Sequence, residues 1–135
     1  EKIANLSKAI EVAEDHDIKA IVATNTTTDH SQLKSKHGQE WGGVSGRPLE
    51  QKATETVECI YGMTDLPVIG VGGVDSAESA YRKIRHGASL VQIYTGFVYK
   101  GPSLARQINR GLVELLEKDG YASIEEVVGI DCKEA

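Results

Sequence analysis

A pair of adjacent glycines, Gly72 and Gly73, gives the sequence its best candidate for an anion-binding turn. The preceding residues 66–71 are mostly apolar and predict a strand buried on both faces, and the residues from Ser76 onward predict a helix. Because glycine has no Cβ, a phosphate can approach the backbone N–H groups of such a turn, next to the positive end of a helix. The alternative is that the glycines only allow a tight turn, since Gly-x-Gly-Gly alone is a weak signal.

Two further clusters place hydroxyls and glycines where they can share one phosphate. Tyr94, Thr95 and Gly96 end the third predicted strand, and Ser45 and Gly46 come late in the long segment after the first strand. Backbone N–H groups and the Thr95 hydroxyl can then meet the phosphate held by the glycine pair, with the Ser45 segment closing one side. The alternative is that Thr95 and Ser45 only cap helices.

The first predicted strand ends in a polar cluster, residues 24–28, that suits a different ligand group. Asn25 combines a donor and an acceptor in one planar amide, and Thr26 adds a hydroxyl, so the two can bind a polar planar ligand such as a carboxylated heterocycle. The alternative is that a threonine-rich strand end satisfies its own backbone.

The sequence offers binding groups but no general base. It contains no Ser-His-Asp arrangement and no pair of carboxylates that can be argued to act as acid and base. The histidines share no i, i+4 spacing, so we expect surface positions rather than metal ligands: His16, His30, His37 and His86. Arg47 can pair with a ligand, although exposure next to Pro48 is the simpler account.

Composition excludes several classes of protein. The net charge of −5 and the pI near 5.4, without a local run of Lys and Arg, exclude a nucleic-acid surface. Cys59 and Cys132 lie far apart and predict reduced thiols rather than a disulfide or a metal site. No apolar run approaches the ~20 residues of a membrane span, so we expect the chain as given to be soluble.

Helical and strand patterns alternate along the whole chain. Asp75 or Ser76 caps the third helix, with Glu78 placed to complete a capping box, and Gly87 ends it. Segment 30–41 predicts a loop, and 131–135 a frayed tail. The predicted strands are 18–23, 66–71 and 88–94, and the predicted helices are 3–15, 48–61, 76–86, 104–115 and a short terminal one at 121–129.

This alternation predicts an α/β fold with three parallel strands. Three strands cannot close a barrel, and 135 residues fall well short of the roughly 250 of a complete (β/α)8 barrel. We therefore expect residues 1–135 to be the C-terminal half of such a barrel, a fragment that begins partway through a larger protein. Uncovered strand edges and helix faces then predict marginal stability or dimerisation.

Four motifs, in this order, resemble the C-terminal part of class 2, quinone-dependent dihydroorotate dehydrogenases. They are Ala-Thr-Asn-Thr-Thr at 23–27, Gly-Gly-Val-Ser-Gly-Arg-Pro-Leu at 42–49, Ile-Gly-Val-Gly-Gly-Val at 69–74 and Gly-Ala-Ser-Leu-Val-Gln-Ile-Tyr-Thr-Gly at 87–96. The resemblance implies an FMN flavoprotein that oxidises (S)-dihydroorotate to orotate in pyrimidine biosynthesis and reduces a membrane quinone. Carried over by motif, Asn25 and Thr26 hold orotate, and the residues that touch FMN are Thr24, Ser45, Gly46, Gly72, Gly73, Tyr94 and Thr95.

The resemblance also implies what the chain lacks. The family's catalytic serine base, other substrate contacts and the helices that receive quinone belong to the missing N-terminal half, so the isolated chain is expected to be inactive. The membrane would be the mitochondrial inner membrane in a eukaryote or the cytoplasmic membrane in a bacterium. Two alternatives stay open: another flavin or sugar-phosphate barrel enzyme, or a non-catalytic half-barrel that binds phosphate or self-associates.

Overall fold

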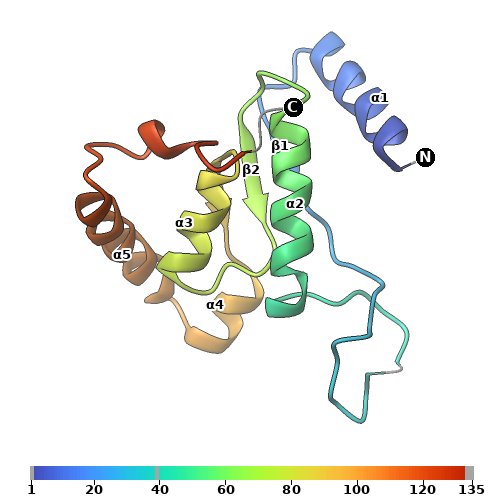
Figure 1. The fold of residues 1–135 in the computed structure, drawn as a ribbon. Coiled ribbons are helices and arrows are strands. Elements are labelled where there is room, and N and C mark those ends of the chain that lie inside the picture. Colours follow the sequence, from blue (N-terminus) through green and yellow to red (C-terminus); the bar gives the residue numbers. More distant parts are fainter. Residues whose placement is uncertain (1, 39, 133–135) are drawn as a thin grey trace.

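The computed structural model describes residues 2–38 and 40–132 and has an α/β architecture (Figure 1). Helices and strands alternate as the sequence predicts, and the tail residues 133–135 lie outside the described part. The elements are α1 Lys2–Asp15, β1 Ile21–Ala23, the 3-10 turn η1 Arg47–Leu49, α2 Glu50–Tyr61, β2 Val68–Val71, α3 Ala77–Arg85, β3 Ala88–Gln92, α4 Thr95–Lys100, α5 Leu104–Asp119 and the 3-10 turn η2 Glu125–Val127.

The three strands form one parallel sheet in the order β1-β2-β3. Ile69 in the central strand pairs with Val22 on one side and with Leu90 on the other, so these three side chains form a row across one face of the sheet. The carboxyl ends of all three strands therefore lie at the same edge.

Helices cover the opposite face of the sheet. Ile10 of α1 and Val57 and Ile60 of α2 are buried against Ala23 and Val68 of the strands. A second cluster joins α3 and α5 to β3 and the segment after β2 through buried and half-buried apolar side chains: Val74, Ala80, Leu104, Ile108 and Val91. This face supplies the hydrophobic core, as expected for strands linked by crossover helices.

The row Val22–Ile69–Leu90 stays uncovered by the described elements. Val22 is 55% exposed and Leu90 is 63% exposed, although both lie in strands. Parallel sheets are normally covered on both faces, and exposed apolar rows mark places where other protein surface packs. The arrangement is that of part of a barrel, with this row on the face that would point to the barrel interior.

Two local details differ from the sequence expectation. Residues 95–100 form a helix, α4, where only a turn was expected. The box at the start of α3 is built from two serines, because Ser79 N–H donates to Ser76 Oγ (3.2 Å) and the N–H of Ser76 donates to Ser79 Oγ (3.0 Å). The expected partner Glu78 is exposed, so that part of the prediction is wrong.

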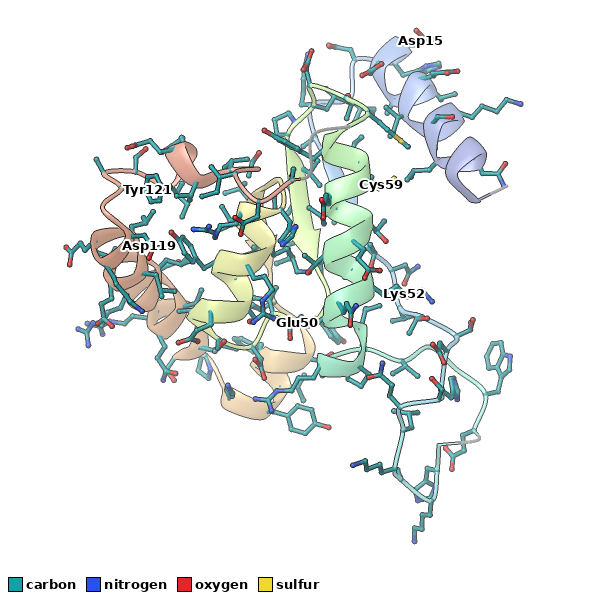
Figure 2. All side chains as sticks on the ribbon, viewed as in Figure 1. Asp15, Glu50, Lys52, Cys59, Asp119 and Tyr121 are labelled. Carbon is teal, nitrogen blue, oxygen red and sulfur yellow. The ribbon has the colours of Figure 1, made fainter. Side chains whose placement is uncertain are left out.

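The C-terminal segment is more ordered at Asp131, and less helical before it, than expected. Only one 3-10 turn forms in place of the helix at 121–129. Arg85 donates from Nε and Nη2 to both carboxylate oxygens of Asp131 (2.6 and 2.7 Å), which lowers the pKa of Asp131. Asp119 lies at the end of α5 (Figure 2) and accepts from the Tyr81 hydroxyl at 2.9 Å. Asp131 and Asp119 are thus both tied to α3.

Candidate functional site

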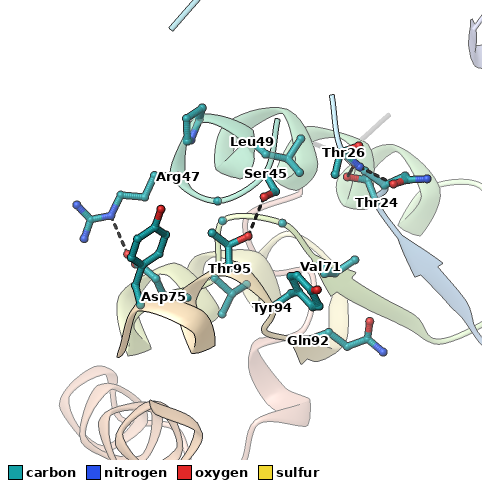
Figure 3. A pocket seen from close by; sticks show the side chains of 18 of the residues that line it. Thr24, Thr26, Ser45, Arg47, Leu49, Val71, Asp75, Gln92, Tyr94 and Thr95 are labelled. Atoms are coloured by element: carbon teal, nitrogen blue, oxygen red, sulfur yellow. Dashed lines mark hydrogen bonds and ion pairs between the residues drawn. The ribbon is translucent and has the colours of Figure 1, made fainter. Parts of the chain in front are cut away.

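The edge where the strands end opens into a cavity of about 630 Å³. Its lining comes from the segments after β1, β2 and β3 and from the end of the long β1–α2 connection (Figure 3). All the binding residues expected from the sequence line this one cavity: Thr24, Asn25, Thr26, Ser45, Gly46, Gly72, Gly73, Tyr94 and Thr95. The cavity thus lies at the carboxyl ends of the parallel strands, which is where barrel enzymes bind their ligands.

Ser45 and Thr95 meet directly, fifty residues apart in sequence. The Thr95 hydroxyl donates to Ser45 Oγ at 2.8 Å (Figure 3). Neither side chain caps a helix, because the N-cap residues of η1 and α4 are Gly46 and Tyr94, and neither helix has a side-chain cap. The helix-cap interpretation is therefore wrong, and two hydroxyls stand together inside the cavity.

The glycine pair has a packing role besides any ligand role. Gly72 and Gly73 have φ values of +115° and +76°, which favour glycine. A Cβ on Gly73 would lie 2.3 Å from Glu50 Cβ, and one on Gly72 would lie 2.8 Å from Ala53 Cβ. The turn must therefore be glycine for α2 to approach, so the tight-turn interpretation is supported while the backbone still lines the cavity.

The other end of the cavity carries the polar cluster after β1. Thr24 Oγ1 donates to the carbonyl of Asn25 (3.0 Å), and Asn25 Oδ1 accepts from the N–H of Thr26 (2.8 Å). Part of the cluster thus satisfies its own backbone, as the alternative interpretation held. The carboxamide oxygen of Asn25 is engaged, so its NH2 group is the part of the amide that can donate to a ligand.

An antiparallel bridge between Thr27 and Val44 joins the two ends of the long β1–α2 connection. Val44 N–H donates to Thr27 O (2.7 Å) and Thr27 N–H donates to Val44 O (3.1 Å). Gly43 packs so closely on Thr26 that a Cβ there would lie 2.0 Å from Thr26 Oγ1. The bridge brings Ser45 back to the strand edge, which the sequence pattern did not predict.

His30 closes the loop beyond this bridge. Its Nδ1 lies 2.8 Å from Gly38 O and its Nε2 lies 2.9 Å from Gly42 O. Only the imidazolium form can donate from both nitrogens, and these two hydrogen bonds raise the pKa of His30. His30 thus holds the two ends of this loop together. Within residues 2–38 and 40–132 no cluster of three metal-ligating side chains occurs.

The sequence offered Arg47 as a partner for a ligand, but it did not point to four other residues that line the cavity: Asp75, Gln92, Tyr99 and Lys100. Arg47 and Asp75 form an ion pair (Nε to Oδ2, 2.7 Å), and Lys100 Nζ donates to the carbonyl of Asp75 (2.7 Å). Gln92 follows the exposed row of β3 into the cavity, and Tyr99 comes with the unexpected helix α4. Alternation along β3 is the one sequence signal that could have indicated Gln92. The positions of the other missed residues depend on tertiary packing.

Comparison with known sequences identifies the family. A sequence model of the family described as dihydroorotate dehydrogenase matches residues 1–116. A protein of Natronomonas pharaonis named dihydroorotate dehydrogenase (quinone) is 55% identical over 95% of this chain and 37% of its own length. One of Haloarcula marismortui with the same name is 54% identical over 91% of this chain and 35% of its own length. The chain spans about a third of these relatives.

Solved structures of dihydroorotate dehydrogenases share the fold of this chain. The Eimeria tenella DHODH in complex with ferulenol superposes with a TM-score of 0.90 at 32% identity, over 98% of this chain and 36% of that one. The ligand-free type DHODH of the same organism gives 0.84 at 35% identity, over 92% of this chain and 35% of that one. None of the helices in the described ranges combines the length and apolar character needed to cross a bilayer. The chain belongs to the dihydroorotate dehydrogenase family.

Proposed function

We propose that this chain is the FMN-phosphate and partial orotate site of a quinone-dependent enzyme that oxidises (S)-dihydroorotate to orotate. The observation that carries the proposal is the gathering of all nine expected residues around one cavity. Family membership and the quinone enzymes among the relatives support it. They also favour it over another sugar-phosphate barrel enzyme.

The residues present suit FMN. The cavity of about 630 Å³ lies within the roughly 300–1,000 Å³ typical of small-molecule and cofactor sites. One end offers the Ser45 and Thr95 hydroxyls beside the backbone of the glycine turn, which suits a phosphate. When bound, FMN would take up the reducing equivalents of the substrate and pass them to quinone.

The chain's own residues would bind and orient the substrate and the cofactor. Asn25 and Thr26 would hold the planar orotate ring by hydrogen bonds, while Thr24 and Tyr94 would flank the flavin. The residues proposed to hold FMN and orotate include no general base. The proton acceptor is therefore expected in the part of the relatives that this chain does not match. Fixed placement of both ligands is this chain's contribution to the reaction.

The uncovered row Val22–Ile69–Leu90 would pack against the rest of the barrel, so that residues 1–135 form part of a single FMN-binding domain. Without that half, self-association through the same face is expected. Quinone would be received by the region absent from this chain, at a membrane. The prokaryotic relatives favour the cytoplasmic membrane over the mitochondrial inner membrane.

FMN titration followed by flavin fluorescence tests the proposal. We expect binding and reduction by dihydroorotate when this chain is mixed with the N-terminal half of a quinone-dependent enzyme. Thr95→Val should weaken FMN binding by about tenfold through loss of one hydrogen bond to a charged group, whereas the matched Thr56→Val on α2 should not. If folded halves together bind no flavin, the site assignment fails and the non-catalytic half-barrel is the better account.

A further inference from the structure

The rim of the proposed phosphate cradle is made by three segments that come from different parts of the chain. They are residues 45–47, the turn 72–75 and helix α4. The first and third are joined by the Ser45–Thr95 hydrogen bond. The other two junctions both converge on one residue, Asp75, whose side chain is only 18% exposed.

Asp75 joins segment 45–47 to the turn through its side chain. Arg47 Nε donates to Asp75 Oδ2 at 2.7 Å, and this contact links residues 28 positions apart (Figure 3). The Arg47 side chain is 75% exposed, so it lines the cavity while staying largely open to solvent. An ion pair of this kind fixes the spacing of two loops more than it adds to overall stability.

Asp75 joins α4 to the turn through its backbone. Lys100, the last residue of α4, donates from Nζ to the Asp75 carbonyl at 2.7 Å. At the other end of the helix, a Cβ on Gly96 would lie 2.7 Å from Val74 O and 3.1 Å from Asp75 Cα. The helix that carries Thr95 therefore rests directly on the backbone of residues 74–75.

We propose that Asp75 is a positioning residue that locks the three rim segments into one closed ring and thereby sets the shape of the anion cradle. The inference rests on the proposed function for its ligand, and on the contacts alone for the ring. Loss of the ring lowers the fraction of molecules in the binding-competent shape, which raises the apparent Kd in proportion.

Two variants separate positioning from charge. Asp75→Asn keeps an oxygen that can accept from Arg47 Nε but removes the negative charge, whereas Asp75→Ala removes both. If Asp75 positions the ring, Asp75→Ala raises the Kd for inorganic phosphate about fivefold, as expected for a partly exposed ion pair, and Asp75→Asn restores most of the affinity. If charge dominates, both variants bind phosphate more tightly.

The test uses the full chain, with Asp65→Ala as the matched control at an exposed aspartate outside the cavity. Amide hydrogen exchange without ligand reports on the ring, with α5 as the internal reference. We expect Asp75→Ala to speed exchange severalfold in segment 45–47, whose contact with the turn uses the Asp75 side chain. Asp75→Asn and the control should leave it unchanged. Unchanged exchange in Asp75→Ala, or tighter phosphate binding, overturns the proposal. If the wild-type chain binds no phosphate, the proposed function fails. Hydrogen exchange then still tests whether Asp75 holds the rim segments together.

Discussion

Replacing the buried Lys83 with methionine should stabilise the protein at neutral pH, because the native state keeps an ammonium group out of water. Lys83 on α3 is fully buried, and its Nζ donates to Thr54 Oγ1 on α2 at 2.9 Å. Its stem fills the space beside Gly70, where a Cβ would lie 2.6 Å from Lys83 Cδ. Methionine keeps most of that stem and adds no charge.

The magnitude follows from the pKa of Lys83, which falls from 10.5 to about 8. Loss of hydration is the main cause, nearby Glu50 acts in the opposite direction and Arg82 adds to the fall. As the pH drops below 10.5 the unfolded chain takes up a proton before the native state does, so stability falls until pH 8 and is level below it. The cost is about 3 kcal/mol at pH 7 and about 1 kcal/mol at pH 10.

Against this gain stands the lost hydrogen bond to Thr54, worth about 1 kcal/mol. Thr54 Oγ1 still donates to Glu50 O (2.9 Å), so its hydroxyl keeps a partner. Glu50 begins α2, on the side that faces α3 (Figure 2). We therefore expect Lys83→Met to add about 2 kcal/mol at pH 7 and little at pH 10.

Urea unfolding at pH 7, 8.5 and 10 measures the difference between the two proteins, in which other titrating groups cancel. Lys8→Met, at an exposed position on α1, is the control and should change stability equally at each pH. A destabilised Lys83→Met at pH 7, or a difference from wild type that stays constant between pH 7 and 10, would refute this account of the buried ammonium.

Two further changes test the site's supports. Because hydrogen bonds to Gly38 and Gly42 raise the pKa of His30, histidine NMR titration should give a value above 6.5, with the loop contacts present in acid and lost as the pH rises through that value; a value at or below 6.5 contradicts the arrangement. Gly96→Ala should cost about 1–3 kcal/mol, since its Cβ would lie 2.7 Å from Val74 O. In the control Gly62→Ala the new Cβ would lie 3.7 Å from Glu58 O, so stability in chemical unfolding should change by less than about 0.5 kcal/mol. Equal losses in the two variants would disprove the steric argument.

The sequence predicted the elements whose patterns are long enough to be periodic. Helix α5 shows its apolar stripe over sixteen residues, and β2 is a plain apolar run, so both were identified. Helix α4 escaped because six residues give no usable period and Gly96 disfavours a helix. That helix exists because its glycine lets it rest on residues 74–75, which is a tertiary fact.

The site divides in the same way. Thr24, Gly72 and Thr95 were found because each follows a strand, and parallel strands deliver their ends to one edge. Asp75 and Lys100 were not found, because their pairing depends on where α4 packs. The sequence placed the groups that meet the cavity but not the contacts that fix them.

The bridge between Thr27 and Val44 also divides the β1–α2 connection into the segment that it encloses and the segment that follows Val44. The segment between Thr27 and Val44, described at 28–38 and 40–43, has both ends held by this bridge, so extra length inserted in this segment raises the closure entropy only slowly. Ser45 would keep its place at the strand edge whatever this segment carries. Because Leu33 in this segment lines the cavity, the exposed residues 34–37 are the place to graft a reporter or a tether.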